Sequence, residues 1–214
     1  MKPSRLYELG VEEARAHHLT SKTYSGKLVR PHVKFIKKLI DEYDCKTMLD
    51  YGAGKGKQYE WLVDGKTPME EYLGVNVTKY DPAWPPYEKD PEGKFDITIC
   101  TNTLGRIPFV DMDWVVDRIY ALTNKVLYVA VGYGGRLKKR LHRKSQHIMP
   151  NNNWPVEKWA SALTRLNSTV ETYLFVRLKE DNMRNGKVLL KLNGWEHVPS
   201  SSFFENLDLS DEAS

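Results

Sequence analysis

A glycine-rich segment follows a short apolar run, and it is the part of this chain best suited to bind a ligand. The segment reads Leu49-Asp-Tyr-Gly-Ala-Gly-Lys-Gly56. Its alternate glycines, Gly52, Gly54 and Gly56, let a backbone turn tightly and approach a ligand closely. Asp50 ends the apolar run, and open α/β sheets bind ligands at the ends of such strands. The pattern predicts a ligand-binding turn between a buried strand and a helix.

Three known glycine patterns compete for this segment. The dinucleotide pattern G-x-G-x-x-G needs a glycine where Lys57 stands, so it fails. The phosphate-binding loop G-x-x-x-x-G-K-[ST] fails twice, at Tyr51 and at Gln58. The third pattern, D-x-G-x-G-x-G after a strand, fits at Asp50, Gly52, Gly54 and Gly56. A plain strand–helix turn without a ligand is the alternative, but it would not need the conformational entropy that three glycines lose.

A second acidic residue follows the next apolar run. Asp81 comes 25 residues after Gly56, between Tyr80 and Pro82. The two oxygens of a carboxylate at the end of a second strand suit the two hydroxyls of a ribose. An aspartate that caps a turn before a proline is the structural alternative.

Hydrophobic periodicity predicts the fold class. Apolar residues at helical spacing predict a helix after Pro31 and others over residues 112–122 and 155–166, with a short one over 58–64. Strands are expected over residues 47–51, 71–80, 95–101 and 125–132, and then over 169–179 and 187–192. The last two are joined through Asn185-Gly186, a hairpin signal. This order predicts an α/β, Rossmann-like doubly wound sheet with a C-terminal antiparallel hairpin.

The glycine segment resembles motif I of the class I S-adenosylmethionine-dependent methyltransferases. Residues 95–104, Phe-Asp-Ile-Thr-Ile-Cys-Thr-Asn-Thr-Leu, are similar to motif IV of the same family. The likeness covers about residues 24–165 and is greatest to methyltransferase-domain proteins of bacteria and phages. It rests further on Tyr24-Ser-Gly-Lys27, Pro31-His32, Lys55-Gly-Lys-Gln-Tyr59, Tyr80-Asp-Pro-Ala83, residues 109–114, Gln146-His147, Trp154 and Trp159.

The resemblance implies an enzyme that uses S-adenosyl-L-methionine and methylates an O or N nucleophile of an unidentified substrate. The glycine loop would wrap the methionine part of the cofactor, Asp50 would help to hold its amino group, and Asp81 would hold its ribose. The cofactor-binding residues that it implies are Asp50, Gly52, Ala53, Gly54, Gly56, Asp81, Pro82, Asn102, Thr103, Leu104 and Tyr24. Tyr24 would close over the cofactor, although an ordinary packing tyrosine is the alternative.

The chain departs from the family pattern in two places. Many relatives read Glu-His-Ile-Pro after motif IV, whereas this chain has Gly105-Arg106 before Ile-Pro, which puts turnover in question. The family also has a helix and a strand between strand two and motif IV. Only 13 residues, rich in proline, separate Asp81 from Phe95 here, so we expect a sheet trimmed at that point. The loop over residues 82–91 would then build the adenine pocket, with Trp84 or Tyr87 stacking.

Methyl transfer asks little of the protein beyond alignment of the nucleophile and exclusion of water. A base is needed only for a weak nucleophile such as an alcohol. His147 is the catalytic candidate because it follows the fourth strand and because a histidine side chain can change its protonation state near working pH. A surface histidine is the alternative for His147, and a core or capping group is the alternative for the weaker candidate His32.

A basic run covers residues 136–144, from Arg136 to Lys144, and could contact the phosphates of a nucleic acid or of a phosphorylated substrate. A solvated surface loop is the alternative. Two rival functions therefore remain: a non-catalytic accessory protein that binds S-adenosylmethionine, and a basic nucleic-acid-binding module. A steep loss of DNA or RNA affinity with salt would identify the second.

Composition bounds these possibilities. The 214 residues are 41% hydrophobic and 28% charged, with a net charge of +4, as in ordinary globular proteins. No apolar run reaches the ~18 residues of a membrane span, and the two cysteines, Cys45 and Cys100, have no metal-ligand spacing. We expect a cytoplasmic protein with no metal and no membrane partner. Its parts would be an N-terminal segment over residues 1–30 that closes over the site, a methyltransferase domain over 31–198 and a flexible acidic tail over 199–214.

Overall fold

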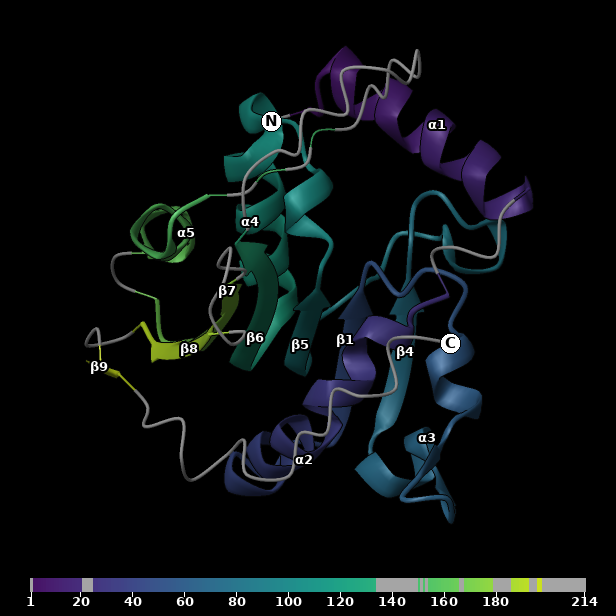
Figure 1. Ribbon diagram of the computed structural model, residues 1–214, viewed down its shortest axis with the longest axis vertical. Helices are drawn as coiled ribbons and strands as arrows, with labels where there is room; N and C mark the ends of the chain where they lie inside the picture. The colour runs from purple at the N-terminus through teal and green to yellow at the C-terminus, as the bar shows by residue number, and fades with distance from the viewer. Residues whose placement is uncertain are drawn as a thin grey trace.

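The computed structural model describes residues 2–20, 25–133, 150, 152, 154–165, 168–178, 186–192 and 196–197. Within these residues the central sheet has seven strands in the order β4-β1-β5-β6-β7-β8-β9 (Figure 1). The five parallel strands are β1 (Thr47–Tyr51), β4 (Asn76–Tyr80), β5 (Phe95–Thr101), β6 (Thr123–Tyr133) and β7 (Glu171–Leu178). The antiparallel ones are β8 (Gly186–Lys191) and β9 (Glu196–His197). The predicted α/β class is confirmed.

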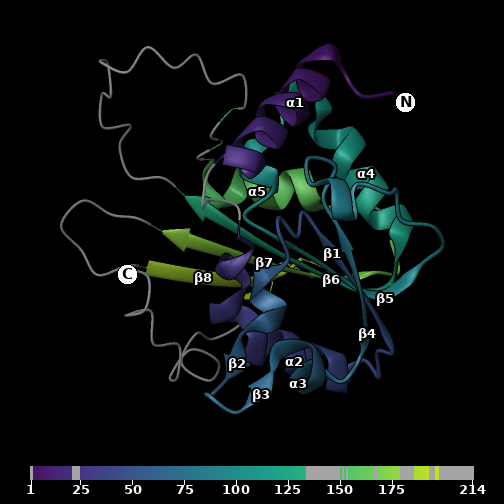
Figure 2. The same cartoon turned by 90° about the vertical axis from the view of Figure 1, so that its right-hand side faces the viewer.

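Helices cover both faces of the sheet, as the side view shows (Figure 2). One face packs against α2 (Val33–Glu42) and α3 (Met69–Leu73), and the other against α4 (Met112–Leu122) and α5 (Val156–Leu163). Successive strand residues point to opposite faces, so Met48 joins the core under α2 while Leu49 joins the core under α4. Because the central strands are buried on both faces, they read as near-continuous apolar runs.

The first helix, α1 (Arg5–Thr20), lies beyond the carboxyl ends of the central strands (Figure 1). Ser4 precedes it and binds Asp111, since its N–H and its hydroxyl each donate to that carboxylate over 2.6 Å. Tyr7 packs edge-on against Trp114 of α4, with ring centroids 5.2 Å apart. Near the other end, Arg15 donates to the carbonyl of Pro82 over 3.1 Å. α1 is thus attached both to α4 and to the loop after β4.

Two local predictions were wrong. Residues 58–64 do not form an α-helix: the 3-10 turn η2 (Lys57–Glu60) gives way to a hairpin of β2 (Leu62–Val63) and β3 (Thr67–Pro68), because Asp64 and Gly65 both adopt positive φ. Residues 71–80 are not one strand either, since α3 occupies the first part. Met69 and Leu73 are four apart and both buried, and Gly74 ends the helix at φ 69°.

The connection from β4 to β5 holds only the 3-10 turn η3 (Pro85–Tyr87). Its prolines prevent a helix there, and β4 is the edge strand of the described sheet. β7 and β8 pair antiparallel, as the hairpin signal predicts, while the turn at Asn185 lies outside the described residues. Residues 199–214, the expected tail, also lie outside them.

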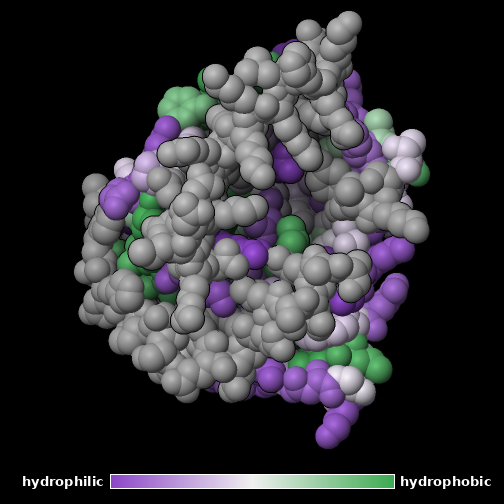
Figure 3. All heavy atoms as spheres, in the orientation of Figure 1, coloured by the Kyte–Doolittle hydropathy of each residue, from purple (hydrophilic) through white to green (hydrophobic). Residues whose placement is uncertain are grey.

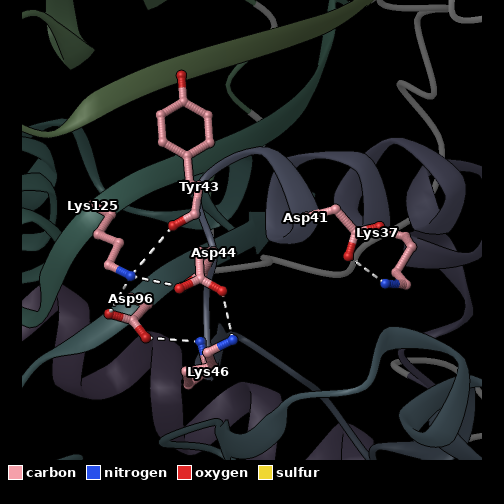
Figure 4. Close-up of polar contacts among 7 residues, drawn as sticks. All are labelled: Lys37, Asp41, Tyr43, Asp44, Lys46, Asp96 and Lys125. Carbon is pink, nitrogen blue, oxygen red and sulfur yellow. Dashed lines mark hydrogen bonds and ion pairs between the residues drawn. The ribbon is translucent and has the colours of Figure 1, made fainter.

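A polar network joins the amino-terminal ends of the strands, at the edge away from the glycine turn (Figure 4). Lys125 Nζ donates to the carbonyls of Tyr43 and Asp44 over 3.3 and 2.7 Å, and it lies 3.4 Å from the Asp96 carboxylate. The N–H of Lys46 donates to Asp96 over 2.8 Å. These contacts fix the starts of β1, β5 and β6 relative to one another.

In the view of Figure 3, hydrophilic and hydrophobic residues are interspersed on the visible surface of the described residues. Most large apolar side chains lie in the two cores, although Phe109 and Val110 are about two-thirds exposed, at 67% and 66%. In the part of the chain that the structure describes, no helix has the length and apolar character needed to cross a bilayer.

Candidate functional site

A cavity of about 840 Å³ lies at the carboxyl ends of the parallel strands. Its floor comes from the glycine turn after β1, the start of the loop after β4, and the ends of β5 and β6. Its roof comes from α1, whose contributions include Gly10, Ala14 and His18. This is the edge at which open α/β sheets bind ligands.

The glycine turn has the backbone conformation that its sequence predicts. Gly52, Gly54 and Gly56 have φ values of 90°, 58° and 69°, which favour glycine. The N–H groups of Gly52 and Ala53 both donate to the carbonyl of Tyr80, over 2.7 and 3.0 Å. A Cβ on Gly52 would lie only 2.1 Å from Thr103 Oγ1, so the turn packs directly on the end of β5.

Asp50 is buried beneath this turn, with 1% of its surface exposed. Its Oδ2 accepts two hydrogen bonds of 2.9 Å, one from Gln58 Nε2 and one from the Tyr59 hydroxyl. Burial nevertheless raises the pKa of Asp50 to about 6, because those two donors only partly offset the loss of water. A cation bound in the cavity would relieve this cost, so Asp50 suits a positively charged ligand group.

Asp81 lies at the end of β4 and is held by backbone groups. Its Oδ2 accepts the N–H of Gly54 and its Oδ1 accepts the N–H of Ala83, each over 2.9 Å. Burial raises its pKa, against the opposing effects of the Ala83 N–H and of His18 on α1. Burial acts in the opposite direction on the base His18, whose pKa it lowers because it disfavours the charged imidazolium, and the Asp81 charge opposes this shift. The two predicted acids, Asp50 and Asp81, thus line one cavity.

The loop after β4 places its aromatic residues around the turn. Trp84 meets His18 edge-on at 5.8 Å between ring centroids, and Lys55 Nζ lies 5.7 Å from the Trp84 ring. Tyr87 packs on Gly56, where a Cβ would lie 2.7 Å from its ring. Neither ring lines the cavity, whose wall here consists of Pro82 and Ala83.

The motif IV residues divide between cavity and core. Asn102 and Thr103 line the cavity, and Asn102 adopts φ 57° while its N–H donates to the Ala130 carbonyl over 2.8 Å. Leu104 is fully buried in the core under α4 and does not line the cavity, and Gly56 does not line it either.

Gly105 and Arg106 line the cavity within the turn η4 (Leu104–Arg106). The carbonyl of Gly105 accepts the N–H of Asn152 over 2.7 Å, and Asn152 Nδ2 donates to the Ile107 carbonyl over 2.7 Å. This turn therefore anchors the chain that returns toward α5.

Three predicted features lie outside the described residues: Tyr24, His147 and the basic run from Arg136 to Lys144. His32 is described and lies in the core, not at the cavity. Its Nδ1 is 2.7 Å from the Tyr128 hydroxyl, and burial lowers its pKa to about 3. This position agrees with the alternative that His32 is a core group.

Sequence reasoning placed residues 1–30 over the site but did not identify which residues of α1 face the cavity, and it missed both partners of Asp50. A signal for the roof exists, since Gly10, Ala14 and His18 recur every four residues and are all buried. That spacing defines one helix face. The partners, Gln58 and Tyr59, come two and three residues after Gly56, the last glycine of the motif.

The chain matches no protein-family model, no curated protein and no solved structure in our comparisons. Among the described residues no group of three or more histidine, cysteine or acidic side chains is placed to hold a metal ion. Arguments about function therefore rest on the geometry of the cavity.

Proposed function

We propose that this protein is an S-adenosylmethionine-dependent methyltransferase with a Rossmann-like sheet. One observation carries the proposal: two carboxylates at the ends of adjacent parallel strands, Asp50 and Asp81, flank a single glycine turn and line the same cavity. A carboxylate at each position suits a ligand with an ammonium group at one end and a vicinal diol at the other.

The residues fit this cofactor. The cavity of about 840 Å³ is within the usual ~300–1,000 Å³ of ligand pockets, large enough for a nucleoside cofactor beside an acceptor. Gly52 and Gly54 present backbone without a side chain at their positions in the floor. Asp50 is a buried acid that a cationic group would stabilise, and each Asp81 oxygen has a further lone pair beyond its backbone hydrogen bond.

When bound, the cofactor supplies a methyl group on a sulfonium, which is already electrophilic. The work of the protein is then alignment and exclusion of water. Asp50 binds and orients the amino-acid end, and Asp81 orients the ribose. Asn102 and Thr103 border the middle of the cavity, and α1 covers it. An amine acceptor needs no base from the protein once it is deprotonated.

The acceptor would enter beside residues 105–108 and α1, which form part of the cavity wall. We propose an oxygen or nitrogen nucleophile as the methyl acceptor. We also propose His147 as the base for this acceptor, and the basic run from Arg136 to Lys144 as the part that holds a phosphorylated substrate or a nucleic acid. We propose further that the N-terminal segment closes over the cofactor.

A transfer assay tests the proposal. The protein is incubated with methyl-tritiated S-adenosylmethionine and separate pools of small alcohols and amines, nucleotides, RNA and DNA. We expect labelled product in one pool, lost in Asp50→Ala. Binding of the cofactor without transfer to any pool would instead favour the accessory protein that binds without turnover.

A further inference from the structure

The two hydrogen bonds to Asp50 converge on one of its oxygens. Gln58 Nε2 and the Tyr59 hydroxyl both donate to Oδ2, each over 2.9 Å. Oδ1 accepts no hydrogen bond from the residues that the structure describes. Both donors lie just beyond the glycine turn. Because both bind Oδ2, they hold that side of the carboxylate and leave Oδ1 for a ligand.

Gln58 is fixed in this role by its surroundings. Its Nε2 also donates to the Ala53 carbonyl over 3.3 Å, and since both of its neighbours are acceptors, the amide can only present its nitrogen to them. Gly26 packs against the other side of the amide, where a Cβ would lie 1.8 Å from Gln58 Oε1. The N–H of Lys57 donates to the Ser25 carbonyl over 3.1 Å and keeps this segment in place.

Tyr59 is fixed as well. It is 5% exposed and belongs to the core under α2. Lys79 Nζ lies 4.5 Å from the centre of its ring and is itself paired with Glu70 over 3.1 Å. Neither donor can therefore turn away from Asp50 without disturbing packed neighbours.

We propose that Gln58 and Tyr59 are positioning residues, which hold Asp50 ionised and with Oδ1 toward the cavity so that it binds the ammonium group of the cofactor. This inference rests on the proposed function, because it assigns the amino-acid end of the cofactor to that oxygen. Both donors are neutral, so they stabilise the carboxylate without cancelling the charge that attracts a cation. A lysine or arginine in either place would compete with the ligand.

The proposal predicts a pH signature that a purely structural role would not give. Asp50, with a pKa of about 6, is mostly ionised at pH 7. Removing the Tyr59 hydroxyl takes away a hydrogen bond to the charged form and raises the pKa of Asp50, by roughly one unit. The other titratable groups that act on Asp50, Asp81, Lys79 and Cys100, are unchanged by that substitution.

The test uses calorimetry with two probes: S-adenosylhomocysteine, which carries the amino-acid end, and 5′-methylthioadenosine, which lacks it. The variants are Tyr59→Phe and Gln58→Met, with Tyr43→Phe as the matched control. The control variant also loses a hydroxyl contact, the partly buried one of 2.9 Å between Tyr43 and the Tyr173 hydroxyl, and Tyr43 lies away from the cavity. The pKa of Asp50 is followed in the ligand-free proteins by NMR of the labelled carboxyl carbon.

In Tyr59→Phe we expect S-adenosylhomocysteine to bind about fivefold more weakly at pH 6, where the ionised fraction of Asp50 falls from about one half to about one tenth, and this loss nearly disappears at pH 8 as Asp50 ionises. Binding of 5′-methylthioadenosine stays within about twofold of wild type, and Gln58→Met behaves like Tyr59→Phe. Equal weakening of both probes, or an unchanged pKa of Asp50 in both variants, would overturn the positioning role. Failure of the wild type to bind either probe would instead overturn the proposed function itself.

Discussion

The N–H of Gly54 lies 2.9 Å from Oδ2 of Asp81 and donates a hydrogen bond to it, which ties the glycine turn after β1 to the end of β4. The other oxygen of Asp81 accepts the N–H of Ala83, so one carboxylate joins the turn to the loop beyond the edge strand. β4 is the edge strand of the described sheet, and Asp81 connects its end both to the glycine turn and to the loop that follows.

Asp81→Asn should weaken both the loop and the ligand site. An asparagine has one acceptor oxygen, so either Gly54 or Ala83 loses its partner, at a cost of about 1–3 kcal/mol. We expect affinity for S-adenosylhomocysteine to fall at least about tenfold, since the charged acceptor for the ribose is lost. Titration calorimetry measures this, and an unchanged affinity would remove Asp81 from the ligand site.

Gly52→Ala should destabilise the fold through a steric clash. The new Cβ would lie 2.1 Å from Thr103 Oγ1 at a φ of 90°, so overpacking adds about 1–3 kcal/mol to the backbone strain. Gly65→Ala is the matched control: its φ is 69° and no atom lies within 4 Å of the new Cβ, so strain alone acts. Urea unfolding should show the larger loss for Gly52→Ala, and equal losses would argue against a close contact with Thr103.

Asp50→Asn should stabilise the ligand-free protein at pH 7.5 while abolishing cofactor binding. The folded pKa of about 6 is above the ordinary value of 3.8, so this carboxyl favours the fold fully below pH 3.8 and less as pH rises through 6. The asparagine avoids a buried charge and should gain about 2 kcal/mol at pH 7.5, with the gain shrinking toward pH 4. Denaturant unfolding at both pH values checks this, and a variant less stable than wild type at pH 7.5 would contradict it.

Ser4→Ala should release the start of α1. The substitution removes the hydroxyl that caps the helix and donates to the buried Asp111, at a cost of about 1–2 kcal/mol. Hydrogen exchange should quicken along α1, and cofactor affinity should fall because α1 roofs the cavity. Arg5→Ala, which removes only exposed ion pairs, is the control and should leave exchange unchanged.

Residues with strong local signals were predicted well from the sequence. β5 matches its predicted residues because an apolar run buried on both faces has no competing interpretation, and the turn after β1 needs positive φ that only glycine adopts readily. Asp50 and Asp81 were predicted from their positions at strand ends, since Asp50 is next to the last residue of β1 and Asp81 directly follows β4.

The remaining errors come from tertiary contacts. Residues 71–80 were predicted as one strand because they are rich in tyrosine and valine, but packing of Met69 and Leu73 against the core under α2 makes residues 69–73 a helix. Leu104 shares a motif with Asn102 and Thr103, yet it turns into the core. The contact that holds the roof in place could not be predicted from sequence, since Ser4 and Asp111 are 107 residues apart.

The most direct test of cofactor binding is calorimetric titration of wild type, Asp50→Ala and Gly54→Val with S-adenosylmethionine. Gly93→Val is the control, since Gly93 also has positive φ, at 81°, but has open space around it. We predict micromolar binding to wild type and to Gly93→Val, and none to the other two variants. An absence of binding to wild type would contradict the proposal that this cavity holds S-adenosylmethionine.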